Sequence, residues 1–295
     1  MIRLAHFSDI HLSSTQLEWK LEDWFSKRLT SWLNHRFLGR ARRFALAEDI
    51  VARLMDDLLQ RGVDHLVFSG DATALGFESE IRRAADFLRI GQFPIPGLAI
   101  PGNHDYCTRR AAASGAFERH FDPWQKGRRI GEHRYPFAQQ VGPLWLIGVN
   151  AATGNRWLWD ASGSVDASQR GRLQQLLAGL GPGLKILVLH FPICLASGRR
   201  EPGYHGLRDL EAVLAVAQAG GVNVWLHGHR HTPFFIQQPG WVRFPVICAG
   251  TATQQDIWSY GEYAINENSL RAIRRAYDPS GRCFREVETF TLRLT

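Results

Sequence analysis

Nine polar residues that could bind metal ions or transfer protons lie in short turns between residues 9 and 231. They are Asp9, His11, Asp71, Asn103, His104, Asp105, His190, His229 and His231. Carboxylate, amide and imidazole groups without a thiolate are typical ligands of divalent manganese, iron, zinc or nickel. Two such ions need roughly eight protein ligand bonds, with positions left open for water and substrate. This set can supply those bonds if one carboxylate bridges the two ions.

Glycine precedes the polar residues in three of these turns, as Gly70, Gly102 and Gly228. Glycine allows a chain to turn sharply and brings the backbone close to a bound ion or substrate. His229 and His231 are two positions apart, a spacing that would keep both on one face of a regular strand. On a turn after Gly228 they could instead reach two neighbouring ions.

The turns follow short apolar stretches that we interpret as strands. We expect strands at 2–7, 64–68, 98–100, 144–149, 184–189 and 222–226, and later at 242–249, 262–266 and 284–294. Apolar residues at helical spacing predict helices from Leu46 to the stop signal at Gly62, and at 78–90 and 168–180. In open α/β sheets, ligands bind outside the carboxyl ends of the strands. Polar residues that are distant in the sequence could therefore converge on one site.

The composition is that of an ordinary globular protein and excludes a disordered chain or a coiled coil. The chain has 295 residues, of which 45% are hydrophobic and 21% charged, and its net charge is +7. An excess of Lys and Arg over Asp and Glu favours anionic partners such as phosphate esters, nucleic acid or an acidic membrane surface. We find no internal repeat or low-complexity linker, so a single domain spanning 1–295 is the simplest interpretation.

Cysteine spacing and hydropathy indicate the cellular compartment in which the protein is expected. Cys107, Cys194, Cys248 and Cys283 are scattered and form no CxxC pair, which argues against a disulfide framework or a structural zinc site. We recognise no signal peptide and no apolar run near the ~20 residues that span a bilayer. The expectation is a cytoplasmic protein, with peripheral membrane association as an alternative.

The order of the polar blocks resembles that of a known family. The blocks are Asp9-Ile10-His11, Gly70-Asp71, Gly102-Asn103-His104-Asp105, His190 and Gly228-His229-Arg230-His231. They are similar to the DxH, GD, GNHD, H and GHxH motifs of the calcineurin-like metallophosphoesterases. The resemblance implies a four-layer α/β/β/α sandwich, in which two mixed β-sheets face each other and helices lie outside.

The resemblance also implies a role for each residue. The first ion would be held by Asp9, His11 and His231, the second by Asn103, His190 and His229, with Asp71 bridging them. A hydroxide between the two ions would attack phosphorus in line. His104 would act on the leaving oxygen as a general acid or stabilise charge in the transition state, and Asp105 would orient His104.

Other residues near the blocks are weaker candidates. We interpret His6 and His227, which lie on expected strands, as core residues or as supports of the ligands. Side chains that could contact a phosphate-ester substrate are Arg109, Arg110, Arg199, Arg200, Arg230, Tyr106 and His205.

The segment 17–44 is an unusual insertion between the first block and the first long helix. Apolar residues recur at helical spacing, and seven Lys or Arg against three Asp or Glu make the segment net +4. This pattern predicts a basic, aromatic amphipathic helix. The helix could pack on the core, cover the metal site as a lid, or contact an anionic membrane surface.

The substrate is less constrained than the metal site. The stretch from Gly70 to Gly76 resembles the GDxTxxG block of bacterial cyclic-nucleotide phosphodiesterases, although Ala72 and Ala74 replace the usual Leu and Asp. A phosphodiester is therefore the leading substrate class. The insertion favours an alternative, a lipid-linked pyrophosphatase similar to UDP-2,3-diacylglucosamine diphosphatase, whose main branch has Arg where His104 stands here.

Two further alternatives carry less weight. The charge would allow a nuclease, but the block at Asp71 does not resemble the nuclease version, so nucleic acid is not the expected partner. A catalytically silent binding scaffold would keep the fold, but such relatives typically lose ligands that are all present here. Metal content separates a scaffold from an enzyme. The sequence leaves the oligomeric state open.

Overall fold

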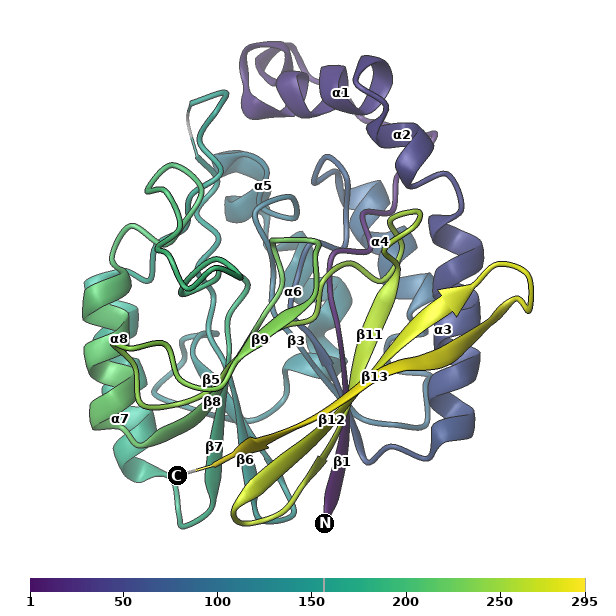
Figure 1. Ribbon diagram of the computed structural model, residues 1–295. Coiled ribbons are helices and arrows are strands. Elements are labelled where there is room, and N and C mark those ends of the chain that lie inside the picture. The colour runs from purple at the N-terminus through teal and green to yellow at the C-terminus, as the bar shows by residue number, and fades with distance from the viewer. Residues whose placement is uncertain (156, 295) are drawn as a thin grey trace.

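The computed structural model describes residues 1–155 and 157–294, and two β-sheets form its centre (Figure 1). The first sheet contains, in spatial order, β13 (Cys283–Arg293), β12 (Ser269–Asp278), β11 (Ser259–Ile265), β1 (Ile2–Phe7), β2 (His65–Phe68) and β3 (Gly97–Ala99). The second contains β4 (Arg128–Arg129), β5 (Phe137–Val141), β6 (Leu144–Gly148), β7 (Leu184–Val188), β8 (Val222–His227), β10 (Val246–Cys248) and β9 (Phe234–Ile236). Both sheets are mixed: β1–β2–β3 and β6–β7–β8–β10 are parallel, whereas β11, β12 and β13 are antiparallel.

Helices cover the outer face of each sheet. The first sheet packs against α3 (Ala47–Arg61), α4 (Glu78–Phe87) and α6 (Ala116–Phe121), and the second against α7 (Ala167–Gly179) and α8 (Leu210–Ala219). Figure 1 shows α3 on one side of the molecule and α7 and α8 on the other. In α3, Ile50, Leu54 and Leu58 recur at helical spacing and are fully buried against the sheet.

A third apolar cluster fills the space between the two sheets. It includes Leu4 and Val67 from the first sheet and Leu146, Val188 and Leu226 from the second. With helices outside each sheet, this cluster completes four layers. The expected four-layer α/β/β/α sandwich is therefore confirmed.

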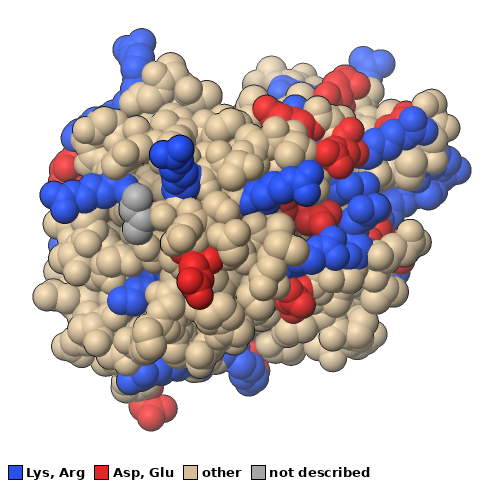
Figure 2. Space-filling view, turned by 60° about the horizontal axis from the view of Figure 1, so that its bottom comes forward, with Lys and Arg blue, Asp and Glu red and all other residues tan. Residues whose placement is uncertain are grey.

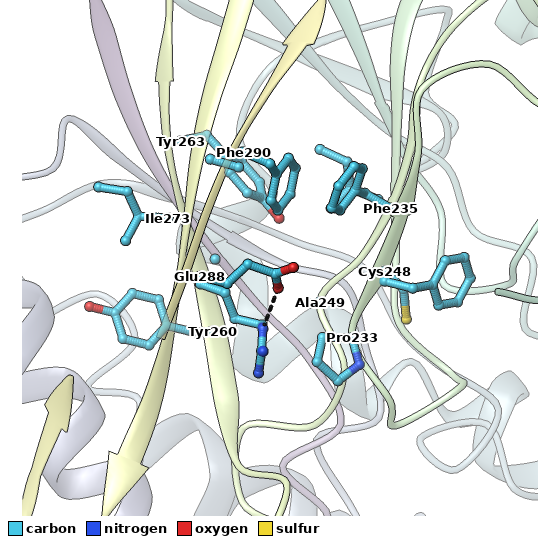
Figure 3. Close-up of a pocket in the computed structure, with 14 residues that line it drawn as sticks. Pro233, Phe235, Cys248, Ala249, Tyr260, Tyr263, Ile273, Glu288 and Phe290 are labelled. Atoms are coloured by element: carbon cyan, nitrogen blue, oxygen red, sulfur yellow. Dashed lines mark hydrogen bonds and ion pairs between the residues drawn. The ribbon is translucent and has the colours of Figure 1, made fainter. Parts of the chain in front are cut away.

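The seam between the sheets is closed by aromatic packing at the β9–β13 side (Figure 3). Phe235 of β9 stacks on Phe290 of β13 with ring centroids 3.6 Å apart. Beside them lies a cavity of about 30 Å³, which Tyr263 and Cys248 also line. Because this space is close to the volume that one water occupies in the liquid, we interpret it as a packing gap between the sheets.

The parallel strands of both sheets end at the same edge, which is the upper edge in Figure 1. Backbone hydrogen bonds link the turns that follow them. Asp9 N–H donates to the Gly70 carbonyl at 2.9 Å, and His11 N–H to the Asp71 carbonyl at 3.1 Å. Across the second sheet, Gly228 N–H donates to the His190 carbonyl at 3.1 Å. The motif turns are thus tied to one another by the sheet framework itself.

The expectation of one continuous amphipathic helix at 17–44 is wrong. The segment forms a 3₁₀ helix, η1 (Leu21–Phe25), followed by α1 (Lys27–Phe37) and α2 (Arg40–Arg43). Ser26 caps α1 by accepting a hydrogen bond from Arg28 N–H, and Gly39 breaks the helix with a left-handed φ of 76°. The segment lies above the upper edge of the sheets in Figure 1.

Arg28 fixes this insertion to the turn that follows Asp71. Its guanidinium donates to the carbonyls of Leu75 at 3.0 Å and Gly76 at 2.7 Å, and pairs with Asp23 at 2.7 Å. The same group lies 3.9 Å from the centroid of the Phe77 ring. Because Arg28 is buried with all these contacts, α1 is held in place directly over the motif turns.

Membrane-spanning helices and disulfide bonds were not expected from the sequence. Among the described residues, no helix combines the length and apolar character needed to cross a bilayer. All four cysteines are free thiols; Cys283 is exposed and the other three are buried.

Candidate metal centre

Five of the candidate ligands share an unusual backbone conformation. Asp9, His11, Asp71, His229 and His231 have left-handed φ values of 54°, 42°, 57°, 69° and 56°. This conformation costs a residue with a Cβ roughly 1–3 kcal/mol and occurs preferentially at functional sites. The sheet framework therefore holds these side chains in strained positions that point into one site.

Asp9, His11 and His231 form a first group of ligand atoms. Asp9 Oδ1 lies 3.3 Å from His231 Nε2 and 3.6 Å from His11 Nε2. The Nδ1 atoms of the two rings contact oxygens, the Thr73 carbonyl at 3.0 Å for His11 and Gln254 Oε1 at 2.7 Å for His231. In the neutral rings the proton is therefore on Nδ1, and the two Nε2 lone pairs face each other at 3.0 Å. Two facing lone pairs and a carboxylate oxygen are what a cation would bind.

His190, His229 and Asn103 form a second group. His190 Nδ1 lies 2.8 Å from the Ser69 carbonyl, which leaves its Nε2 free, and His229 Nδ1 lies 2.8 Å from Asn103 Oδ1. The Nε2 atoms of both histidines are buried and have no hydrogen-bond partner among the described residues. Buried polar atoms without a hydrogen-bond partner are rare in folded proteins, because each one lowers the stability of the fold by about 1–3 kcal/mol.

Asp71 faces both groups. Its Oδ2 lies 3.4 Å from His190 Nε2 and 3.8 Å from His11 Nε2. Its Oδ1 accepts the backbone N–H of His104 at 2.7 Å, which fixes the orientation of the carboxylate. The Asp71 carboxylate thus lies between the two groups of candidate ligand atoms.

The ionisation states suit metal binding. Burial, reinforced by the nearby Arg40 charge, lowers the pKa of His11 to about 4. Burial also holds the pKa of His229 well below its ordinary value. Burial opposes ionisation of Asp9, but the adjacent His11 and His231 rings hold its pKa well below the usual range. Neutral imidazoles and ionised carboxylates are the forms that coordinate metals. His190 differs: burial opposes its charged form, but Asp71 raises its pKa to about 9.

These observations show that the residues fit a pair of divalent cations. The ligand atoms of Asp9, His11 and His231 lie within 4.8 Å of one another, as do those of Asp9, Asp71 and His190. Asp9 Oδ1 and the Nε2 atoms of His190 and His229 are buried donors of electron pairs without a hydrogen-bond partner among the described residues. Oxygen and nitrogen donors in this number suit manganese, iron, zinc or nickel.

Two glycines allow the turns to approach so closely. A Cβ on Gly102 would lie 2.1 Å from Asp71 Oδ1. A Cβ on Gly228 would lie 1.9 Å from Ser8 Oγ and 2.4 Å from Asp9 Oδ2. Any side chain at either position would push a carboxylate out of the site.

Gly228→Ala is therefore expected to weaken metal binding. The added methyl group must displace Asp9, and overpacking of this kind costs about 1–3 kcal/mol. Metal analysis and thermal unfolding of the metal-loaded protein measure the effect. Gly240→Ala is the control, because a Cβ there meets nothing within 4 Å. Equal metal content in the two variants would contradict the proposed role of Asp9.

His104 and Asp105 are arranged differently from the expectation. His104 Nδ1 lies 2.7 Å from the Ala74 carbonyl, which orients the ring toward His11. Asp105 instead accepts hydrogen bonds from Thr73 N–H, Thr73 Oγ1 and Gly102 N–H at 2.9–3.1 Å. The Asp105 carboxylate thus braces two motif turns, and the Ala74 carbonyl rather than Asp105 positions the His104 ring.

A pocket of about 470 Å³ opens above the ligand groups. Asp71, Asn103, His104, His229 and His231 contribute to its floor. Its upper wall comes from the insertion and a neighbouring loop; the lining residues there include Lys27, Thr30, Asn34, Arg40, Arg43, Leu158 and Trp159. Thr30 Oγ1 donates to the Leu158 carbonyl at 3.0 Å, so the insertion and the loop are in direct contact. The site is therefore a cleft in which the candidate metal ligands lie on one side and the cations Lys27, Arg40 and Arg43 of the insertion on the other.

A profile of the calcineurin-like phosphoesterases matches residues 2–233. The chain belongs to the calcineurin-like phosphoesterase family. No curated protein matches the sequence.

Solved structures with the same fold are distant in sequence. A dimetal phosphatase from Danio rerio is 13% identical with a TM-score of 0.67, over 100% of this chain and 99% of that one. A purple acid phosphatase from yellow lupin (Lupinus luteus) seeds is 13% identical with a TM-score of 0.59, over 99% of this chain and 53% of that one. GAP50, described as the anchor in the inner membrane complex of Plasmodium, is 11% identical with a TM-score of 0.56, covering 100% and 89%. At these identities the likeness concerns the fold.

The weaker candidates from the sequence fall into three groups: core histidines, residues that line the pocket and residues that do not. His6 lies in the core between Tyr263 and Ser69, and His227 is fully buried. Arg230 and His205 line the pocket. The others do not line it; they are Tyr106, Arg109, Arg110, Arg199 and Arg200. Tyr106 donates to the buried Glu118 instead, while Arg110 pairs with Glu22 at 3.6 Å and Arg200 with Glu211.

Sequence reasoning missed Lys27 and Arg40 as residues of the site. Both were counted only among the basic residues of the insertion. The available signal was positional, because the insertion begins a few residues after His11 and therefore had to lie near the metal centre.

Proposed function

We propose that this chain is a dinuclear-metal phosphoesterase that hydrolyses a phosphodiester. The observation that carries the proposal is the shared position of Asp71 between two ligand groups at the floor of an open pocket. Asp9, His11 and His231 would hold one ion, Asn103, His190 and His229 the other, and Asp71 both. When bound, the ions would supply Lewis acidity and a nucleophile at neutral pH.

The protein residues have distinct tasks in this reaction. The Ser69, Thr73 and Gln254 oxygens keep the ligand histidines in the tautomer that presents Nε2. His104, with its ring fixed by the Ala74 carbonyl, presents Nε2 to the site and would donate to the leaving oxygen. We assign the whole of 1–295 to one catalytic domain that carries the insertion.

The volume of the pocket is compatible with a diester. A phosphodiester has a substituent on each side of phosphorus, and about 470 Å³ beside the ligand groups leaves room for both. The same cleft would admit a monoester, so the preference has to be measured.

The test loads the purified protein with manganese and compares hydrolysis of bis-p-nitrophenyl phosphate with that of p-nitrophenyl phosphate. We expect the diester to be hydrolysed faster, chelation to abolish turnover, and manganese to restore it. A protein that retains two ions per chain and hydrolyses neither ester would overturn the proposal. A protein that binds no ion would instead indicate a binding scaffold.

A lipid-linked diphosphate at a membrane surface is a second candidate substrate, and the distribution of exposed apolar side chains favours it. Of fourteen large hydrophobic residues exposed in the described chain, ten lie in the insertion or in nearby loops. We call these ten the apolar rim: Leu21, Trp24, Phe25, Leu33, Phe37, Leu38, Trp157, Leu158, Trp159 and Tyr204. Phe37 and Trp159 are each 69% exposed. Exposed aromatic residues beside basic ones are typical of elements that contact anionic lipid.

Replacing Phe37 and Trp159 by Ser is expected to weaken binding to anionic vesicles by at least about tenfold per residue, since each aromatic side chain buried in lipid contributes ~1.5–3 kcal/mol. Sedimentation with phosphatidylglycerol vesicles measures the effect. Leu59→Ser, on an exposed position of α3, serves as the control. If the unmodified protein sediments with neither anionic nor neutral vesicles, the membrane-surface candidate fails, and with it the peripheral location.

Nucleic acid remains a poor candidate partner. Figure 2 shows one face of the molecule, on which basic and acidic side chains lie beside one another and much of the surface is uncharged. Ion pairs such as Arg274–Glu288 and Arg285–Asp278, both at 2.9 Å, neutralise basic residues of β12 and β13. The net charge of +7 is therefore not gathered into a single basic track on that face.

A further inference from the structure

Arg40 reaches into the metal centre from the insertion. Its Nη2 atom lies 3.2 Å from His104 Nε2, 3.2 Å from His11 Nε2 and 3.3 Å from His11 Nδ1. Its Nε atom is buried and has no hydrogen-bond partner among the described residues. The guanidinium therefore still has hydrogen-bonding capacity where the pocket meets its floor.

Lys27 is a second cation of the insertion that faces the same pocket. The residue is only 6% exposed, yet within the described chain no hydrogen bond or ion pair engages its ammonium group. A cation that lines an open pocket and has no anionic partner in the protein is available to bind an anion there.

No carboxylate of the described residues forms a direct ion pair with either cation. Arg230, on the opposite wall, is already paired with Glu201 at 3.1 Å. Asp71 is the acidic residue that lines the pocket, and its carboxylate is directed to the two ligand groups. Arg40 and Lys27 thus have no direct ion-pair partner among the described residues, and the Asp71 charge near them would be shared with the bound ions.

We infer that Arg40 and Lys27 bind the phosphoryl oxygens of the substrate, so that the insertion supplies the anion-binding half of the active site. This inference rests on the proposed function. There His11 Nε2 is committed to an ion and His104 Nε2 to the leaving oxygen, so the Arg40 guanidinium is left to donate to a phosphoryl oxygen. A guanidinium presents several N–H donors in a plane and suits phosphoryl oxygens, whereas the Lys27 ammonium acts as a point charge.

The inference divides the insertion into two functional faces. Arg40 and Lys27 point inward and line the pocket, whereas Arg36 and Arg42 are exposed. A contact with anionic lipid would use the exposed arginines, and substrate binding would use the inward pair. Substitutions on one face should leave the other property intact.

The test measures binding of inorganic phosphate to the manganese-loaded protein by calorimetry, together with metal content. Arg40→Ala should weaken phosphate binding about ten- to a hundredfold, the size expected when a charged hydrogen bond is lost. Lys27→Met should weaken it less, and Arg40→Lys should recover part of the loss. Arg42→Ala is the matched control, because Arg42 lies on the same short helix and is exposed. All variants should retain the metal content of the unmodified protein.

Each outcome bears on one proposal. If Arg40→Ala and Lys27→Met bind phosphate as tightly as Arg42→Ala does, the inference is overturned, whatever the activity. Loss of metal from Arg40→Ala would also overturn it, because Arg40 would then support the ligands rather than the substrate. If the unmodified protein binds phosphate through Arg40 but hydrolyses no ester, the anion site stands and the proposed catalytic function fails.

Discussion

Asp71→Asn is expected to leave a folded protein that binds fewer than two metal ions and has lost its phosphoesterase activity. The amide can still accept the His104 N–H through Oδ1, and its NH₂ group can donate to His190 Nε2, which lies 3.4 Å from Oδ2. Asn also tolerates the left-handed φ of 57° at this position. A neutral amide cannot bridge two cations, so the effect should exceed the ~10–100-fold loss of metal affinity that follows removal of an outer partner.

Metal analysis and hydrolysis of bis-p-nitrophenyl phosphate measure both effects on the same preparation. Asp256→Asn is a matched control, since Asp256 has a left-handed φ of 71° but is exposed and does not line the pocket. Retention of two ions and of most activity in Asp71→Asn would contradict the bridging role. Loss of the cooperative unfolding transition would show that the carboxylate is needed for the fold, and Asp9→Asn would then replace it in the test.

The positions of the candidate ligands at strand ends could be predicted from the sequence because local rules place them. Each polar block follows a buried strand, and parallel strands in both sheets direct their carboxyl ends to the same edge. Glycines before Asp71 and His229 mark turns in which a Cβ would not fit. Strand, turn and ligand thus occur together within a few residues, and only the pairing of the strands is non-local.

The strands missed by the sequence analysis lack such a local signal. β12 (Ser269–Asp278) contains Arg271, Arg274 and Arg275, so its apolar side is interrupted by charge. It is stabilised by its two antiparallel neighbours, β11 and β13, rather than by a buried apolar run. Pairing between strands overrides the weak intrinsic preference of this stretch.

The contribution of the insertion to the site could not be predicted for a related reason. Ser26 begins α1 and Gly39 begins α2 in the structure, whereas the apolar periodicity of the sequence suggested one amphipathic helix. The position of α1 depends on the contacts of Arg28 with the Leu75 and Gly76 carbonyls, about fifty residues away, and α2 packs against α1. Such tertiary contacts leave no periodic pattern in the sequence, so Arg40 could not be assigned to the pocket.

Asp105 illustrates a different limit of sequence reasoning. It follows His104 directly, and the resemblance to the calcineurin-like metallophosphoesterases implied that its carboxylate orients that ring. The turn instead directs the carboxylate back to Gly102 N–H and to Thr73. A carboxylate in a tight turn often binds nearby backbone N–H groups, and here that local preference decides the geometry.

His104→Gln is expected to retain both metal ions and to lose turnover by about 10²–10⁴-fold, the usual contribution of a positioned proton donor. The His104 ring contacts the Ala74 carbonyl and Arg40, and its backbone N–H binds Asp71. The backbone contact survives the substitution, so the bridging carboxylate keeps its orientation. Gln can donate a hydrogen bond to the leaving oxygen but cannot transfer a proton to it.

Comparing two diesters with different leaving groups separates proton transfer by His104 from charge stabilisation by His104. An ester with a poor leaving group depends on protonation of the leaving oxygen, whereas a p-nitrophenyl ester depends on it less. His104→Gln should therefore lose more activity on an alkyl diester than on bis-p-nitrophenyl phosphate, while His133→Gln, at an exposed position, should change neither. Equal losses on both esters would assign His104 to charge stabilisation rather than proton transfer. Loss of metal from His104→Gln but not from His133→Gln would remove His104 from the chemistry altogether and place it among the groups that hold the ions.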